Sequence, residues 1–323
     1  MPSIKKILVP TDFSENASVV FDFVKETAQR YGSTVDLIHI IPRLSYLTVS
    51  RDALGNPFED KDRYRELRAS LEKRLLEDME NHIPEENRGR VFLKYEKWPS
   101  NAIVEHAESN EYDLIMIASR GRGGSIFTRG SVTEKLIRLT HTPVLSVNEG
   151  YNPAIENIVV PTDGSNVSME TIPLAFMIAV QNNASVELLS ISKFDGAKIK
   201  IAGRSSYHYT DAEIREFVWD ALSDFVDDRE NEFEFVKEAS MDDDKFQLKD
   251  AEGNVVNFSI VVEKGTSTHA AIVDYAYDHS QLVVMATHGR GEMAKIFIGS
   301  TTEKVVRHLK MPVLTIKPKS LEN

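Results

Sequence analysis

The run Leu282-Val283-Val284-Met285 leads into Ala286-Thr287-His288-Gly289, and nine residues later the chain reads Gly299-Ser300-Thr301-Thr302. A continuous apolar run that closes on a glycine-bearing loop is typical of a buried parallel strand that ends at one edge of a sheet. The residues from 301 to 309 then predict a helix. Glycines let backbone amides approach an anion closely, and the start of a helix adds unpaired N–H groups and the positive end of its dipole. This stretch therefore predicts a phosphate-binding loop in an α/β fold.

The same pattern occurs once earlier in the chain. Leu114-Ile115-Met116-Ile117-Ala118 precedes a loop that contains Gly121 and ends on Gly130-Ser131. A repeated fold would also repeat its turns, and glycine most often serves the geometry of a turn. The second copy therefore supports the phosphate-binding hypothesis only in part, and a purely conformational role for the glycines stays open.

Other motifs also occur twice, which predicts two tandem domains. Ile7-Leu8-Val9-Pro10-Thr11-Asp12 returns as Ile158-Val159-Val160-Pro161-Thr162-Asp163, and the chain then alternates strands and helices in the same order. We expect an α/β fold with domains at residues 1–150 and 151–323, each a five-stranded parallel sheet with helices on both faces. The second domain carries an inserted middle segment, about residues 196–257, whose end predicts an extra β-hairpin around Glu252-Gly253-Asn254.

Composition excludes several classes of protein. With 41% apolar and 27% charged residues, the 323-residue chain has the composition of a soluble globular protein. The net charge of −12 argues against nonspecific nucleic-acid binding, which requires a basic surface. The absence of cysteine excludes disulfides, thiol catalysis and Cys-ligated zinc. Because the sequence has neither a signal peptide nor a run of about 20 apolar residues, we expect a cytoplasmic protein without membrane or nucleic-acid partners.

The repeat, the Pro-Thr-Asp at a strand end and the loop ending in Gly-Ser together resemble the universal stress protein family, specifically its tandem two-domain members. ATP-binding members of this family carry Gly, two residues, Gly, nine residues, Gly and then Ser or Thr. The second half departs from this pattern only in Ala286, which replaces the first glycine. In the first half Ala118 replaces that glycine, and eight residues separate Gly121 from Gly130.

The resemblance implies a fold, a ligand and an assembly. The fold is the adenine nucleotide alpha hydrolase-like sandwich, and the ligand is ATP, with or without Mg²⁺ on its phosphates. The last strands, Val144-Leu145-Ser146-Val147 and Val313-Leu314-Thr315-Ile316, would pair within one chain as a pseudo-dimer. Association of two chains into a homodimer stays open.

The resemblance also implies two nucleotide sites, of which the C-terminal one is the better match. Its residues are Pro161, Thr162, Asp163, Ile191, Met285, Ala286, His288, Gly289, Arg290, Gly299, Ser300, Thr301 and Thr302. The weaker N-terminal counterparts are Pro10, Thr11, Asp12, Ile40, Ala118, Gly121, Arg122, Gly130, Ser131, Val132 and Thr133. In both sites the aspartate would contact the ribose, the isoleucine backbone would face adenine, and the loop would hold phosphates.

Two plainer interpretations of these residues remain. Asp12 and Asp163 each precede an expected helix closely enough to be its N-cap. Trp98 stands where the second half has Gly265, and an indole there would either block the N-terminal pocket or stack on the base. The sequence leaves both questions open.

The leading interpretation is a stress-response protein that binds ATP as a regulatory or structural ligand. No catalytic or metal-binding residue is assigned. The Gly-x-x-x-x-Gly-Lys-Ser/Thr loop of efficient NTPases is absent, so at most slow hydrolysis is expected. The alternatives are an interaction scaffold without a nucleotide and, less favoured, a slow ATP-hydrolysing or adenylating enzyme.

Overall fold

The computed structural model describes residues 3–42, 49–51, 57–59, 61–119, 131–148, 150, 154–193, 210–237, 245–289 and 298–318. The chain divides into two compact units, Ser3–Glu149 and Gly150–Asn323. Each unit has a central β-sheet with buried aliphatic strands, as the continuous apolar runs of the sequence predict.

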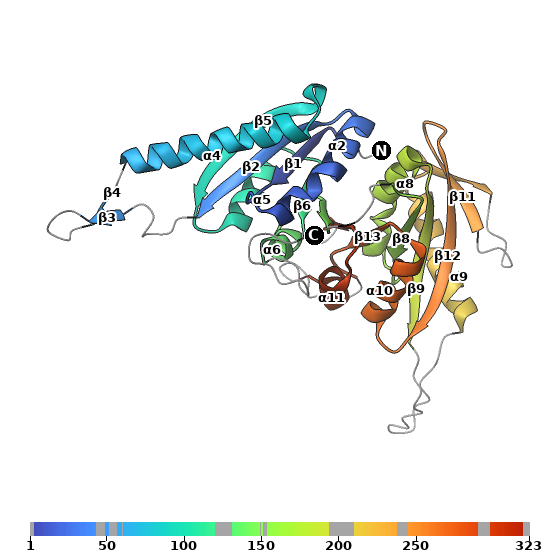
Figure 1. Ribbon diagram of the computed structural model, residues 1–323. Helices are drawn as coiled ribbons and strands as arrows, with labels where there is room; N and C mark the ends of the chain where they lie inside the picture. The colour runs from blue at the N-terminus through green and yellow to red at the C-terminus, as the bar shows by residue number, and fades with distance from the viewer. Residues whose placement is uncertain are drawn as a thin grey trace, which may run out of the picture. The chain divides into compact units, whose positions relative to one another are not determined.

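The N-terminal unit contains the five parallel strands expected from the sequence. Its sheet has the order β7-β6-β1-β2-β5, and every pairing within it is parallel. A separate two-stranded hairpin, β3 with β4, precedes the longest helix. Along the chain the elements are β1 (Lys6–Pro10), α1 (Glu15–Ser18), α2 (Val20–Tyr31), β2 (Thr34–Pro42), β3 (Val49–Arg51), β4 (Pro57–Glu59), α4 (Lys61–His82), a 3-10 turn (Glu85–Asn87), β5 (Arg88–Glu96), α5 (Pro99–Ser109), β6 (Leu114–Ala118), α6 (Ser131–Leu139) and β7 (Val144–Val147) (Figure 1).

The C-terminal unit repeats this plan and extends it. Its sheet has the order β10-β11-β12-β9-β8-β13-β14, in which the last five strands are parallel. Along the chain the elements are β8 (Asn157–Pro161), α7 (Asn166–Met169), α8 (Ile172–Asn182), β9 (Ser185–Lys193), α9 (Asp211–Asp227), β10 (Phe233–Lys237), β11 (Lys245–Asp250), β12 (Val255–Gly265), α10 (Thr268–His279), β13 (Leu282–Ala286), α11 (Ser300–His308) and β14 (Val313–Ile316).

The extra hairpin expected in the inserted segment is present, and it forms part of the main sheet. The turn at Glu252-Gly253-Asn254 does join two antiparallel strands, β11 and β12. However, β12 is also the third parallel strand of the unit, and β10 adds a further antiparallel strand beyond β11. Phe246 and Leu248 alternate inward along β11 and are buried, so the extension lengthens the hydrophobic core.

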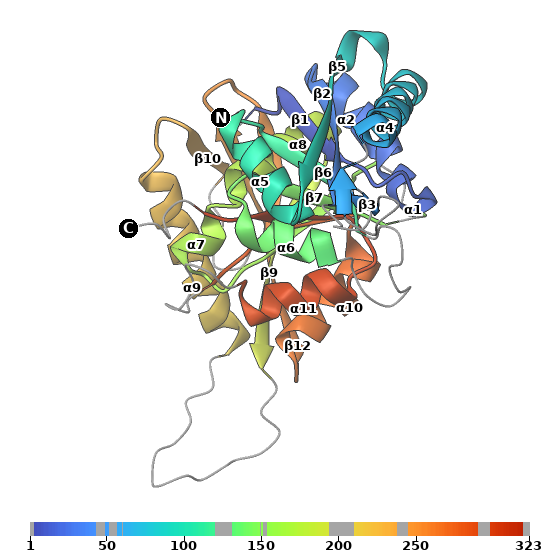
Figure 2. The same cartoon turned by 90° about the vertical axis from the view of Figure 1, so that its left-hand side faces the viewer.

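Helices cover both faces of each sheet because the strand order reverses in the middle. Right-handed crossovers place α2 and α4 on one face of the N-terminal sheet and α5 and α6 on the other. The same rule separates α8 and α9 from α10 and α11, and the last two helices pack side by side (Figure 2). The strand order reverses between the neighbouring strands β8 and β13. The helices that follow these two strands, α8 and α11, lie on opposite faces of the sheet. Open α/β sheets bind ligands in the crevice formed at this position.

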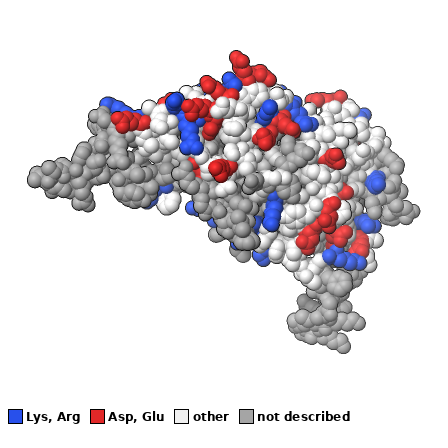
Figure 3. Space-filling view, viewed as in Figure 1, with Lys and Arg blue, Asp and Glu red and all other residues white. Residues whose placement is uncertain are grey.

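On the face shown in Figure 3, Lys and Arg side chains lie among Asp and Glu side chains, in keeping with the net charge of −12. In the described part of the chain no helix is long and apolar enough to cross a membrane.

The predicted pairing of the two last strands stays a prediction.

A buried polar cluster in the N-terminal unit contains Asp36 of β2, Tyr112 and His106 of α5. The Asp36 carboxylate accepts hydrogen bonds from the Arg90 backbone N–H at 2.6 Å and the Tyr112 hydroxyl at 2.5 Å. The same hydroxyl lies 3.5 Å from Nε2 of His106. Burial, assisted by the positive charge of Lys94, lowers the pKa of His106 to about 4. His106 is therefore neutral in the folded protein across the physiological range.

This lowered pKa predicts that acid destabilises the unit. An unfolded chain protonates histidine at about pH 6.5, whereas folded His106 resists protonation until about pH 4. The stabilisation that neutral His106 provides is therefore fully present above about pH 6.5. As the pH falls from about 6.5 toward 4, the free energy of unfolding decreases by roughly 1–3 kcal/mol. Urea unfolding at neutral and mildly acidic pH should show a smaller acid loss for His106→Gln than for the wild type. The exposed control His308→Gln should keep the wild-type slope, and equal slopes in all three proteins would contradict the prediction.

Candidate functional site

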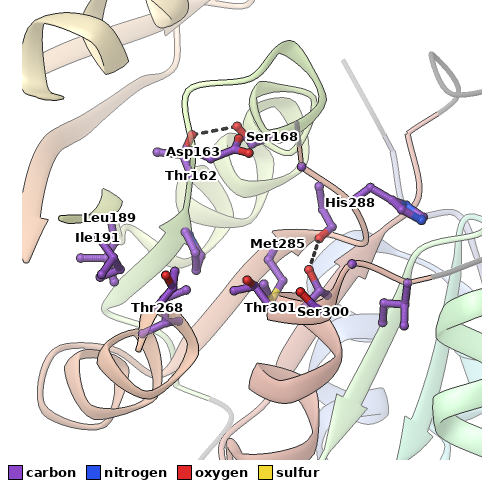
Figure 4. Close-up of a pocket in the computed structure, with 17 residues that line it drawn as sticks. Thr162, Asp163, Ser168, Leu189, Ile191, Thr268, Met285, His288, Ser300 and Thr301 are labelled. Carbon is purple, nitrogen blue, oxygen red and sulfur yellow. Dashed lines mark hydrogen bonds between the residues drawn. The ribbon is translucent and has the colours of Figure 1, made fainter. Parts of the chain in front are cut away.

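A cavity of about 500 Å³ opens at the carboxyl ends of β8, β9 and β13, next to the start of α11. It lies at the reversal of the strand order, where the fold predicts a ligand crevice. In Figure 4, Asp163 and His288 stand on one side of this space, with Ile191 and Thr268 on another. The cavity is lined by Pro161, Thr162, Asp163, Ser168, Leu189, Ile191, Thr268, Ile272, Met285, Ala286, His288, Gly289, Ile298, Gly299, Ser300, Thr301 and Thr302.

The structure brings together every residue that was predicted for the C-terminal site, except that Arg290 lies outside the described residues. Sequence reasoning missed five lining residues, namely Ser168, Leu189, Thr268, Ile272 and Ile298. One of these was accessible to the same logic. Thr268 begins the helix that follows β12, so it stands at the same edge of the sheet as the predicted strand ends.

The Asp163 turn is held by its own short-range hydrogen bonds. Oδ1 of Asp163 accepts the Ser165 backbone N–H at 3.1 Å and the Ser165 hydroxyl at 2.6 Å. Ser165, not Asp163, is the helix N-cap, because its Oγ accepts the Ser168 N–H at 3.2 Å. Asp12 and Ser14 repeat the arrangement in the N-terminal unit. The interpretation of the two aspartates as N-caps is therefore wrong. Asp163 is exposed and lines the cavity.

The loop after β13 returns to the end of the strand that it leaves. The Gly299 N–H donates to the Thr287 carbonyl at 2.8 Å, and the Thr302 hydroxyl donates to the Ala286 carbonyl at 2.9 Å. These bonds fix the start of α11 beside the end of β13. Because Gly299 is the N-cap and has no side chain, no side chain caps the first turn from that position. The Thr302 hydroxyl, expected as a phosphate donor, is already donating to the backbone.

Gly289 and His288 close the loop side of the cavity. A Cβ added at Gly289 would lie 2.5 Å from Oδ2 of Asp163, so only glycine leaves room for this carboxylate. His288 is 6% exposed, and its Nδ1 lies 2.9 Å from the Thr287 hydroxyl. The loop therefore presents backbone and an imidazole to the cavity, with the aspartate next to them.

The opposite wall is mainly apolar. Leu189 and Ile191 of β9 face this side together with Ile272 of α10 and Met285 of β13. A Cβ at Gly265, the last residue of β12, would lie 2.6 Å from that of Ala271, so glycine lets α10 approach the sheet closely. An apolar wall opposite polar loop groups suits a ligand with one flat apolar end and one anionic end.

The N-terminal unit places its predicted residues at equivalent positions. Pro10 and Ala118 end β1 and β6, Ile40 lies in β2, and Thr11 and Asp12 follow β1. Ser131, Val132 and Thr133 begin α6, and the Thr133 hydroxyl donates to the Ala118 carbonyl at 3.2 Å, which repeats the Thr302 bond. Gly121, Arg122 and Gly130 lie outside the described residues.

The expected correspondence between Trp98 and Gly265 is wrong by two positions. Trp98 is the N-cap of α5, and Ser267 is the N-cap of the equivalent helix α10. Gly265 ends β12, where the N-terminal unit has Glu96 at the end of β5. The indole, 57% exposed, thus belongs to a helix cap and does not replace the glycine that lets the helix approach the sheet.

The model of the universal stress protein family matches residues 3–148 and again residues 154–317. The chain belongs to the universal stress protein family. Its two matched regions make it a tandem member, as the sequence predicts.

Individual relatives match one unit or the whole chain. A universal stress protein from Methanocaldococcus jannaschii is 31% identical over 155 residues, which is 44% of this chain and 94% of the relative. A solved universal stress protein from Archaeoglobus fulgidus has a TM-score of 0.65 at 18% identity and covers 97% of this chain and 98% of its own. This second likeness shows the shared fold across both units.

Two solved relatives contain nucleotides. One is a universal stress protein in complex with cAMP, and the other is a second, shorter universal stress protein from Archaeoglobus fulgidus in complex with dAMP. Each covers 45% of this chain, with a TM-score of 0.32. Nucleotide binding is thus recorded for these two relatives.

Proposed function

We propose that the C-terminal unit of this universal stress protein binds an adenine nucleotide, ATP first among them, as a regulatory or structural ligand in the stress response. The observation that carries the proposal is the cavity, where a carboxylate, an apolar wall and the start of α11 surround one space. An adenosine phosphate offers the matching parts, namely ribose hydroxyls, an apolar base and anionic phosphates.

Each part of the cavity suits one part of this ligand. The Asp163 carboxylate accepts hydrogen bonds, as ribose hydroxyls require. Ile191 and Ile272 supply a wall against which a base would pack. Ser300 and Thr301 lie in the first turn of α11, where backbone N–H groups and the helix dipole favour phosphate. Mg²⁺ would enter with the phosphates of ATP.

We favour binding over catalysis for chemical reasons. No lysine is among the described residues of the cavity wall, and the Gly-x-x-x-x-Gly-Lys-Ser/Thr loop is absent from the sequence. We therefore expect bound ATP to persist, with slow turnover at most.

We also propose a weaker second site in the N-terminal unit. The Thr133–Ala118 hydrogen bond repeats the closure of the C-terminal loop. The shorter spacing between Gly121 and Gly130 argues for lower affinity there.

Titration calorimetry of the full chain with ATP and with AMP tests the proposal. The wild type should bind ATP, and Asp163→Ala should lower the affinity of the stronger site roughly tenfold, because the ribose loses a charged acceptor. The matched variant Asp12→Ala should leave that site unchanged. An absence of binding at millimolar ATP would favour the scaffold alternative, and rapid phosphate release would favour an enzyme.

A further inference from the structure

Helix α9 contacts the turn that carries Asp163. A Cβ added at Gly164 would lie 2.1 Å from the Cε1 and 2.7 Å from the Cδ1 atom of Phe217. The Phe217 ring therefore occupies the space that a side chain at Gly164 would need. Gly164 has a φ of +70°, and its N–H donates to the Thr162 hydroxyl at 3.0 Å. The ring thus covers the middle of a turn with a left-handed backbone.

The N-terminal unit fills the same space in another way. The residue equivalent to Gly164 is Phe13, which also has a positive φ, +61°, and whose N–H donates to the Thr11 hydroxyl at 3.1 Å. Its ring is buried and packs against His39 at an interplanar angle of 39°, with centroids 4.5 Å apart. Arg74 of α4 donates to the Phe13 carbonyl at 2.9 Å and lies over the ring. An aromatic ring therefore covers the turn in both units, but in the C-terminal unit it comes from α9.

α9 itself is firmly attached to the unit. Its first turn has a capping box, in which Thr210 and Glu213 satisfy each other's backbone N–H groups. Asp211 forms an ion pair with Lys264 of β12 at 3.0 Å. Behind Phe217, four buried side chains anchor the helix to the sheet, namely Val218, Leu222, Phe225 and Val226. Phe217 is 45% exposed, so its contact with the turn is not explained by core packing.

We propose that Phe217 is a positioning residue, through which α9 holds the Asp163 turn in the conformation that binds nucleotide. This inference rests on the proposed function. Asp163 is the neighbour of Gly164, and its Oδ2 fits against Gly289 with no space for an added atom. A turn released from the ring would let this carboxylate leave the position in which it faces the cavity. The inserted region thereby acts on ligand affinity without lining the cavity.

Two measurements on the full chain test the role of Phe217. Hydrogen exchange of the amides of residues 163–165 should be faster in Phe217→Ala than in the wild type, with no ligand present. ATP affinity measured by calorimetry should fall roughly tenfold in the same variant and recover in Phe217→Leu, which restores an apolar contact. The control Val236→Ala removes a similarly exposed apolar side chain of the same unit and should change neither quantity.

The two readouts separate the inference from the proposed function. If the wild type binds no nucleotide but exchange accelerates in Phe217→Ala, the proposed ligand is wrong and the contact with the turn is real. If the wild type binds ATP and Phe217→Ala binds it equally well, the positioning role is overturned. Unchanged exchange in Phe217→Ala overturns it as well.

A paired substitution tests the contact geometry directly. Gly164→Ala places a methyl group against the Phe217 ring, whereas the Gly164→Ala/Phe217→Ala double variant has room for it. The double variant should therefore unfold at a higher temperature than the sum of the two single effects predicts. Additive effects would overturn the inference.

Discussion

The substitution Gly289→Val is expected to abolish high-affinity nucleotide binding by the C-terminal unit, lowering the affinity at least about 100-fold, or roughly 2.7 kcal/mol. Its Cβ would lie 2.5 Å from Oδ2 of Asp163, a separation that real Cβ atoms do not show. Either the aspartate or the loop must move, and both line the cavity. Titration of the variant with ATP measures the effect.

The fold should survive this change, because Gly289 is in the loop after β13 and not within the strand. Thermal unfolding and circular dichroism of Gly289→Val should therefore stay close to the wild type. Ala251→Val adds similar bulk at an exposed turn of the same unit and should retain ATP binding. Wild-type affinity in Gly289→Val would show that the Asp163–Gly289 contact does not shape the binding site.

The substitution Gly89→Ala is expected to destabilise the N-terminal unit by roughly 2–4 kcal/mol. A Cβ there would lie 2.1 Å from Oδ1 of Asp36 and 2.8 Å from the Val35 carbonyl oxygen. The Val35 carbonyl oxygen belongs to the backbone and can move only at a substantial cost in free energy. The buried Asp36 carboxylate would lose its hydrogen bonds from Arg90 and Tyr112. Urea unfolding followed by tryptophan fluorescence, with Trp98 reporting on this unit, would record the loss.

A matched control comes from the next residue. Arg90→Ala keeps the backbone N–H that donates to Asp36 and removes only the side chain, so its cost should be below about 1 kcal/mol. ATP binding by the C-terminal unit should persist in Gly89→Ala. Equal stabilities of Gly89→Ala and Arg90→Ala would mean that the close approach at Gly89 does not govern the packing of β5.

The sequence was sufficient to predict the repeated α/β plan and most of the cavity wall. Apolar runs that end on Pro-Thr-Asp or on a glycine loop specify buried parallel strands, and such strands end at one edge of a sheet. Asp163, Ile191, Gly289 and Gly299 were therefore predicted to converge, and all four line the cavity. The strand alternation also located the β11–β12 turn, although it did not show that a single strand, β12, serves both the hairpin and the parallel core.

Only the tertiary structure determined which residues cap these elements and which distant residues contact them. The choice of Ser165 instead of Asp163 as N-cap depends on backbone angles that several short polar residues allow. The position of Trp98 relative to Gly265 depends on where β5 and β12 give way to helices, and sequence spacing locates such boundaries poorly. The Phe217 ring reaches Gly164 from 53 residues farther along the chain. Local periodicity specifies an element and the face that it buries, whereas the packing of distant elements determines which side chain meets which turn.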